Sequence, residues 1–195
     1  MVVLISGGGS NLRALLDAAD SPLYGARIMA VGADNPADGL AHADLFGVPS
    51  FVVSPSNFDS REAWAEVLLE NVNFFKPDLV VLAGFMRILP PEFVRALSPK
   101  LINTHPSLLP NFPGAHAVHD AISAGAAETG VTIHVVDKGV DTGPHIAQRS
   151  LKILPGESEG ELHERIKVVE RELLVETVLA IAEKKIDLNQ VSKIS

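Results

Sequence analysis

The 195-residue chain contains no cysteine, which excludes disulfide bonds, thiolate catalysis and metal centres held by cysteine. Positive charge is also scarce, since 16 lysine and arginine residues face 24 acidic ones and the formal net charge is -8. This balance argues against a broad nucleic-acid-binding surface. Neither a membrane-spanning apolar run nor a signal peptide is present. We therefore expect a cytoplasmic protein that binds small molecules rather than nucleic acid or membranes.

Several common catalytic and nucleotide-binding motifs are absent as well. The glycines at positions 7–9 are not followed by the lysine of a P-loop, and their spacing is not Gly-x-Gly-x-x-Gly. No serine lies in a Gly-x-Ser-x-Gly turn. Without a serine elbow or a thiol, direct group transfer is favoured over a covalent acyl-enzyme.

Apolar segments of strand length alternate with helical patterns along the first half of the chain. Strands are expected at residues 2–5, 27–31, 49–53, 78–82 and 100–104, and later at 129–136 and 145–153. Ser10 is a favourable helix cap, and residues 159–185 form the last long helix. This order predicts an α/β fold, a Rossmann-like, mostly parallel sheet with helices on both faces, in a single domain over residues 1–195.

The segment Asn103-Thr-His105-Pro-Ser-Leu-Leu-Pro110 carries the first candidate site residues. Asn103 and His105 are two residues apart on a strand, so their side chains share one face, and Pro106 ends the strand. Open α/β sheets bind ligands at that edge. Asp141 lies in a turn flanked by Gly139 and Gly143, from which a carboxylate could reach the imidazole.

Together an amide, an imidazole and a carboxylate suit the transfer of an acyl or formyl group to an amine. Negative charge develops on the carbonyl oxygen during attack, and an Asn amide and an imidazolium can stabilise it. The carboxylate would favour and orient the imidazolium. Taken singly, however, each residue is more often a turn former or a structural hydrogen-bonding group than a catalytic one.

The remaining histidines give weaker signals. His116 and His119 are three residues apart at the start of an expected helix, a spacing that can bind zinc, but no further cluster of ligand residues accompanies them. We expect no metal. His42, His134, His145 and His163 give no functional signal.

Three segments resemble the folate-dependent formyltransferases: Asn103 to Pro110, Asp141-Thr-Gly-Pro144 and Leu82-Ala-Gly-Phe-Met-Arg-Ile-Leu89. The likeness covers nearly the whole chain. Within that family it is greatest to members that formylate glycinamide ribonucleotide in purine biosynthesis. The resemblance implies 10-formyltetrahydrofolate as cosubstrate, a phosphate-binding N-terminal half and a catalytic, folate-binding C-terminal half. We expect a monomer or homodimer. It implies that Asn103, His105 and Asp141 are catalytic.

The resemblance also implies two sets of binding residues. Those for the ribonucleotide are Gly9, Ser10, Asn11, Lys167 and Glu170. Those for the folate are Arg61, Met86, Arg87, Ile88, Leu89, Asn103, Asp137, Lys138, Gly139, Val140 and Asp141.

Three alternatives stay open. Family members that formylate methionyl-tRNA share the Asn, His and Asp core but carry an additional C-terminal domain, whereas this chain ends soon after its last helix. Members that hydrolyse formyltetrahydrofolate carry an extra N-terminal domain, whereas Met1 here directly precedes the first strand. A catalytically silent ligand-binding module is the third, although the presence of all three catalytic residue types speaks against it.

Overall fold

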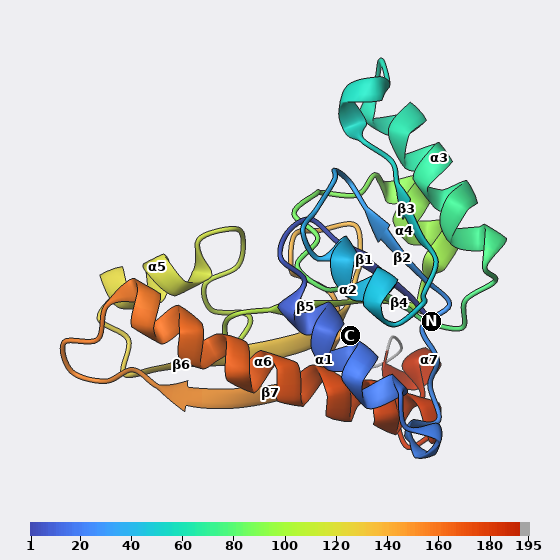
Figure 1. The fold of residues 1–195 in the computed structure, drawn as a ribbon. Coiled ribbons are helices and arrows are strands. Elements are labelled where there is room, and N and C mark those ends of the chain that lie inside the picture. Colours follow the sequence, from blue (N-terminus) through green and yellow to red (C-terminus); the bar gives the residue numbers. More distant parts are fainter. Residues whose placement is uncertain (192–195) are drawn as a thin grey trace.

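A seven-stranded sheet forms the centre of the computed structural model, which describes residues 1–191 (Figure 1). The strands pair in the order β3-β2-β1-β4-β5-β6-β7. The first five in that order run parallel, and β6 and β7 are antiparallel to their neighbours. The strands are β1 (Val2–Ile5), β2 (Ala30–Ala33), β3 (Ser50–Val52), β4 (Val80–Leu82), β5 (Leu101–His105), β6 (Glu128–Val135) and β7 (His145–Lys152). The predicted α/β, mostly parallel sheet is confirmed.

Helices cover both faces of this sheet. The α-helices are α1 (Ser10–Ala19), α2 (Leu40–Leu45), α3 (Arg61–Phe74), α4 (Pro91–Leu97), α5 (Ala117–Ser123), α6 (Glu159–Ala182) and α7 (Leu188–Val191), and the short 3-10 helices are η1 (Pro22–Tyr24) and η2 (Pro55–Asn57). None of the helices within residues 1–191 is both long and apolar enough to cross a membrane.

Alternating side chains of the central strands pack into two separate cores. Val3 and Ile5 of β1 belong to one core, which includes Leu12 of α1 and Leu174 of α6. Val2 and Leu4 belong to the other, which α3 and α4 cover through residues such as Trp64 and Phe93. Because β1 is buried at every position, its continuous apolar sequence is what a central parallel strand requires.

The longest helix, α6, starts with a complete capping box. The Ser158 hydroxyl accepts the backbone N–H of Glu161, and the Glu161 carboxylate accepts the backbone N–H of Ser158. Figure 1 shows α6, in orange to red, running beside β6 and β7. The expected helix over residues 159–185 is confirmed, with its end at Ala182.

Two local predictions are wrong. Ser10 is not the cap of α1, because Gly9 takes that position with a positive φ of 70° and the helix begins at Ser10. Glycine is favoured at position 9, since its φ lies in the left-handed region and a Cβ there would also lie 3.0 Å from the Cα of Gly39. The second strand begins at Ala30 rather than at residue 27, because its pairing with β1 starts opposite Val2.

Candidate active site

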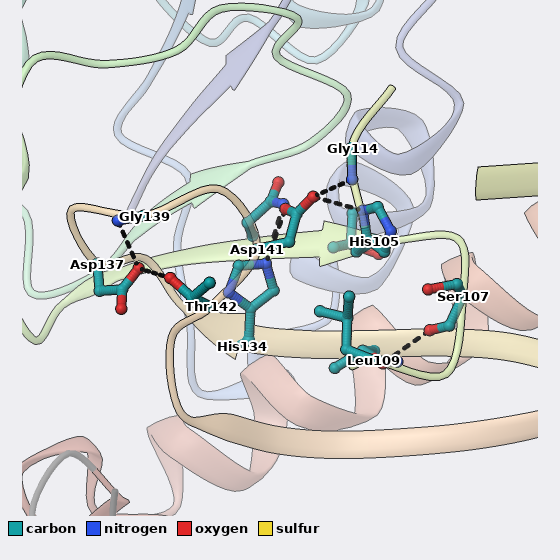
Figure 2. Close-up of polar contacts among 12 residues, drawn as sticks. His105, Ser107, Leu109, Gly114, His134, Asp137, Gly139, Asp141 and Thr142 are labelled. Carbon is teal, nitrogen blue, oxygen red and sulfur yellow. Dashed lines mark hydrogen bonds and ion pairs between the residues drawn. The ribbon is translucent and has the colours of Figure 1, made fainter. Parts of the chain in front are cut away.

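The carboxylate of Asp141 lies between two imidazole rings (Figure 2). Its Oδ2 is 3.3 Å from Nδ1 of His105, and its Oδ1 is 3.5 Å from Nε2 of His134. The backbone N–H of Gly114 donates to Oδ2 at 2.8 Å. The structure therefore brings Asp141 and His105 together, as the sequence predicts, although 35 residues of chain separate them.

The backbone at Asp141 is unusual. Its φ of 55° lies in the left-handed region, which costs most residues about 1 kcal/mol or more but which Asp and Asn tolerate best. The turn also needs its glycines, because a Cβ on Gly143 would lie 1.8 Å from the carbonyl oxygen of Val135. The loop thus holds the carboxylate at one place above the end of β5.

Both nitrogens of His105 face hydrogen-bond acceptors. Nε2 donates to the carbonyl oxygen of Phe112 at 2.9 Å, while Nδ1 faces the Asp141 carboxylate. A neutral imidazole carries only one N–H, whereas the imidazolium carries two. Two oxygen atoms therefore hold this buried ring in one orientation. The imidazolium, which oxyanion stabilisation needs, can donate to both of them.

The surroundings of Asp141 favour its charged form. Burial raises the pKa of this carboxyl, but hydrogen bonding with His134 and Gly114 and the positive charges of His105 and His134 outweigh burial. The pKa of Asp141 is therefore held below its ordinary value. A carboxylate that stays ionised can keep facing His105 throughout the neutral pH range.

His134 is a site residue that the sequence did not reveal. It lies opposite Asn103 in the antiparallel pairing of β5 with β6, and its Nε2 is 3.2 Å from Nδ2 of Asn103. Its Nδ1 contacts the carbonyl oxygen of Val135 at 3.0 Å. The neutral ring accepts from the Asn103 amide, and the protonated ring donates to Asp141. The signal that could have revealed it is strand register, which the sequence alone does not provide.

Exposed apolar side chains lie on the two loops that the resemblance assigns to the folate. Met86 and Ile88, in the loop after β4, are 76% and 65% exposed, and Val140 is 49% exposed. Large apolar side chains left in water are unusual and often mark binding surfaces. The side chain of Asp137 accepts hydrogen bonds from Gly139 and Thr142 of its own loop, which stabilises that loop (Figure 2).

A family model described as formyl transferase matches residues 1–178 of the chain. The chain belongs to the formyl transferase family. It is 50% identical over 182 residues to a phosphoribosylglycinamide formyltransferase of Mycobacterium tuberculosis, a match that covers 93% of this chain and 84% of that protein. It is 42% identical over 172 residues to the phosphoribosylglycinamide formyltransferase of Escherichia coli, covering 87% of this chain and 81% of that protein.

Solved structures of formyl transferases share the fold. The crystal structure of glycinamide ribonucleotide transformylase 1 from Symbiobacterium toebii superposes with a TM-score of 0.91 and 37% sequence identity, covering 94% of this chain and 87% of that one. The corresponding protein of Geobacillus kaustophilus gives a TM-score of 0.87 with 44% identity over 92% of this chain and 96% of that one. The family resemblance predicted from the sequence is confirmed.

The residues expected to bind the ribonucleotide lie on two elements of this formyl transferase. Gly9, Ser10 and Asn11 form the start of α1, where free backbone N–H groups can bind an anion. Asn11 is buried, and its Oδ1 has no hydrogen-bond partner among residues 1–191. On α6, Glu170 accepts a hydrogen bond from Thr104 of β5 at 2.9 Å, whereas Lys167 pairs with Glu164 of its own helix.

Two arginines expected at the folate have other partners. Arg61 is the first residue of α3, and its Nε is 3.8 Å from the carboxylate of Glu62. Arg87 forms an ion pair with Asp34, which follows β2. The side chain of Arg87 is thus directed toward the far side of β1, although its backbone lies in the exposed loop after β4.

His116 and His119, whose spacing can bind zinc, have different surroundings in the structure. His116 precedes α5 without making a side-chain cap, whereas His119 faces Glu159 at 3.1 Å and the hydroxyl of Ser123 at 3.3 Å. Within residues 1–191, no group of three or more His, Cys, Asp or Glu side chains is placed to hold a metal ion.

Proposed function

We propose that this formyl transferase moves the formyl group of 10-formyltetrahydrofolate to the amine of glycinamide ribonucleotide, giving formylglycinamide ribonucleotide and tetrahydrofolate in purine biosynthesis. The observation that carries the proposal is the cluster of Asn103, His105 and Asp141 at the end of β5, in a chain that is 50% identical to a phosphoribosylglycinamide formyltransferase. That the enzyme works in the cytoplasm, as a monomer or a homodimer, is part of the same proposal.

We assign the two substrates to separate halves of one domain over residues 1–195. The start of α1 takes the phosphate of the ribonucleotide on its backbone N–H groups, and Glu170 of α6 contacts the glycinamide part. The loop of residues 86–89 and the loop of residues 137–141 form the two walls for the folate ring. The exposed Met86, Ile88 and Val140 fit that role, because a flat ring would remove their apolar surface from water.

The Asn103 amide and the His105 imidazolium stabilise the transition state. As the amine attacks the formyl carbon, a C–N bond forms and negative charge gathers on the formyl oxygen. The Asn103 amide has two N–H groups, and only one is needed for the contact with His134. The second can donate to the oxyanion. Nε2 of His105 can also donate to it once the hydrogen bond from this nitrogen to the carbonyl oxygen of Phe112 is broken.

Asp141 acts on the same step through His105 and through proton transfer. Its charge favours the imidazolium and fixes the ring through Nδ1. Collapse of the tetrahedral species breaks the bond between the formyl carbon and the folate nitrogen. The attacking amine loses a proton and the departing nitrogen gains one, so protons and charge balance, and Asp141 can order a water molecule that carries the proton.

The purified protein should be mixed with 10-formyltetrahydrofolate, with and without glycinamide ribonucleotide, while tetrahydrofolate release is followed by absorbance. The proposal predicts turnover only when the ribonucleotide is present. Equal release in both mixtures would instead assign a formyltetrahydrofolate hydrolase. No release in either would contradict the proposed acceptor, and methionyl-tRNA would then be tested in its place.

A further inference from the structure

Three loops at the carboxyl edge of the sheet are joined by a ring of polar contacts. Ser6 follows β1, Asp34 and Asn35 follow β2, and Met86 and Arg87 follow β4. The Ser6 hydroxyl accepts the backbone N–H of Met86 at 2.8 Å. The Asn35 amide donates to the carbonyl oxygen of Ser6 at 3.0 Å and to the carboxylate of Asp34 at 2.8 Å.

The ion pair between Asp34 and Arg87 closes this ring. The strands that lead to it are not neighbours, because β1 lies between β2 and β4 in the sheet. The Arg87 side chain therefore reaches across the end of β1 to the Nε–Oδ2 contact with Asp34. The Asp34 side chain is only 1% exposed, whereas that of Arg87 is 48% exposed.

A charge as deeply buried as Asp34 is costly unless it is paired and hydrogen-bonded. Here Asn35 contacts one carboxylate oxygen and Arg87 the other, so losing Arg87 would leave that charge poorly compensated. The pair can thus hold its loops together more firmly than an exposed ion pair can.

The ring connects the two binding regions of the proposed function. Ser6 leads directly into the glycine turn that ends at Gly9, the cap of α1. Gly39 of the segment after β2 also donates its N–H to the carbonyl oxygen of Gly7 at 3.1 Å. On the other side, Met86 and Arg87 begin the loop assigned to the folate wall. These contacts therefore join the two loops, in addition to the backbone hydrogen bond from the Ser6 N–H to the carbonyl oxygen of Gly84 at 3.1 Å.

We propose that Asp34 and Arg87 are positioning residues that hold two loops at a fixed distance, and so couple the binding of the two substrates. One is the glycine turn before α1, which binds the phosphate, and the other is the loop of residues 86–89, which binds the folate. This inference rests on the proposed function and assigns Arg87 to Asp34 rather than to direct contact with the folate ring. Removing the pair loosens both loops at once, and the KM values of both substrates rise together. Asn103, His105 and Asp141 lie on β5 and the loop after β6, so kcat changes little.

The test compares Asp34→Asn, Arg87→Met, Arg87→Lys and the double variant Asp34→Asn with Arg87→Met. We expect Asp34→Asn and Arg87→Met each to raise both KM values by about tenfold, a common size for coupling between two sites, with kcat within about twofold. The double variant should be no worse than either single one, because the two residues act through one contact. Arg87→Lys keeps the charge and should recover most of the affinity.

Arg95→Met is the matched control. Arg95 makes an exposed ion pair with Glu92 on α4, eight residues after Arg87, and its loss should leave both KM values unchanged. Melting temperatures are measured for every variant, because a merely structural pair would lower the melting temperature without moving KM.

Three results would overturn the inference: unchanged KM values in folded Asp34→Asn, a rise confined to the folate KM in Arg87→Met, or multiplied effects in the double variant. If Asp34→Asn does not fold, the two Arg87 variants still decide the matter through the ribonucleotide KM. Lack of turnover in the wild-type protein would instead refute the proposed function, so the two failures are distinguishable.

Discussion

Replacing Asp141 by Asn tests the electrostatic part of the mechanism. Asn tolerates the left-handed backbone at this position nearly as well as Asp, so the φ of 55° adds little strain. The Asn oxygen can still accept the Gly114 N–H. What disappears is the negative charge that faces Nδ1 of His105 and Nε2 of His134.

The size of the effect on kcat is estimated from the lost interaction with His105. A hydrogen bond to a charged group contributes about 1.5–3 kcal/mol, and about 1.4 kcal/mol corresponds to a factor of ten in rate. The Asp141 side chain is only 12% exposed, so solvent screens the interaction weakly. We therefore expect kcat to fall by about tenfold to a hundredfold, with the KM of the ribonucleotide nearly unchanged.

The pH dependence supplies a second readout. Because the pKa of Asp141 lies below its ordinary value, its charge stabilises the fold above the unfolded-state pKa of about 4, and this stabilisation is lost as pH falls through the lower folded-state pKa. Asp141→Asn should therefore have a lower free energy of unfolding at neutral pH, and the difference should shrink below about pH 4. The same carboxylate faces the imidazole of His105, so the loss of activity in Asp141→Asn should depend on pH.

Steady-state kinetics from pH 5 to 9 and urea unfolding at pH 7 and pH 3 measure these effects. Asp187→Asn makes the same chemical change at an exposed position before α7 and serves as the control. A near-wild-type kcat in Asp141→Asn, or an unchanged pH profile, would refute the coupling between Asp141 and His105.

The other predictions concern two residues of the site and one helix cap. Asn103→Ala should lower kcat by about a hundredfold to a thousandfold in the steady-state assay, as for loss of one oxyanion donor, and a near-wild-type rate would remove its assigned role. His134→Phe should lower kcat by about tenfold, since about 1–1.5 kcal/mol of hydrogen bonding to Asn103 is lost. An unchanged kcat would show that His134 does not contribute to the reaction. Ser158→Ala should lower the free energy of unfolding by about 1 kcal/mol in urea titrations while leaving kcat unchanged, and full stability would show that the capping box of α6 is dispensable.

The parts that the sequence predicts are those determined by local pattern. A continuous apolar run at residues 2–5 predicted a buried strand, and the spacing of Asn103 and His105 put both at the end of another. Proline and glycine around Asp141 indicated the turn that carries it. Long, strongly patterned elements such as α6 were located to within a few residues.

The parts that the sequence does not predict depend on pairing between distant segments. His134 looked like any strand residue, and only the register of β6 against β5 places it beside Asn103. Asp34 drew no prediction from the sequence, and its burial beneath Arg87 depends on the order of β2, β1 and β4 in the sheet. Ser10 was predicted as a cap on its side chain alone, whereas the close approach of Gly39 decided in favour of Gly9.

The fate of the formyl carbon tests the central claim most directly. 10-Formyltetrahydrofolate labelled with ¹³C at the formyl carbon should be incubated with the enzyme and glycinamide ribonucleotide, and the products analysed by mass spectrometry and NMR. The account predicts that the label appears on the glycinamide nitrogen, in an amount equal to the tetrahydrofolate released. Label recovered as formate, with the ribonucleotide unmodified, would contradict it.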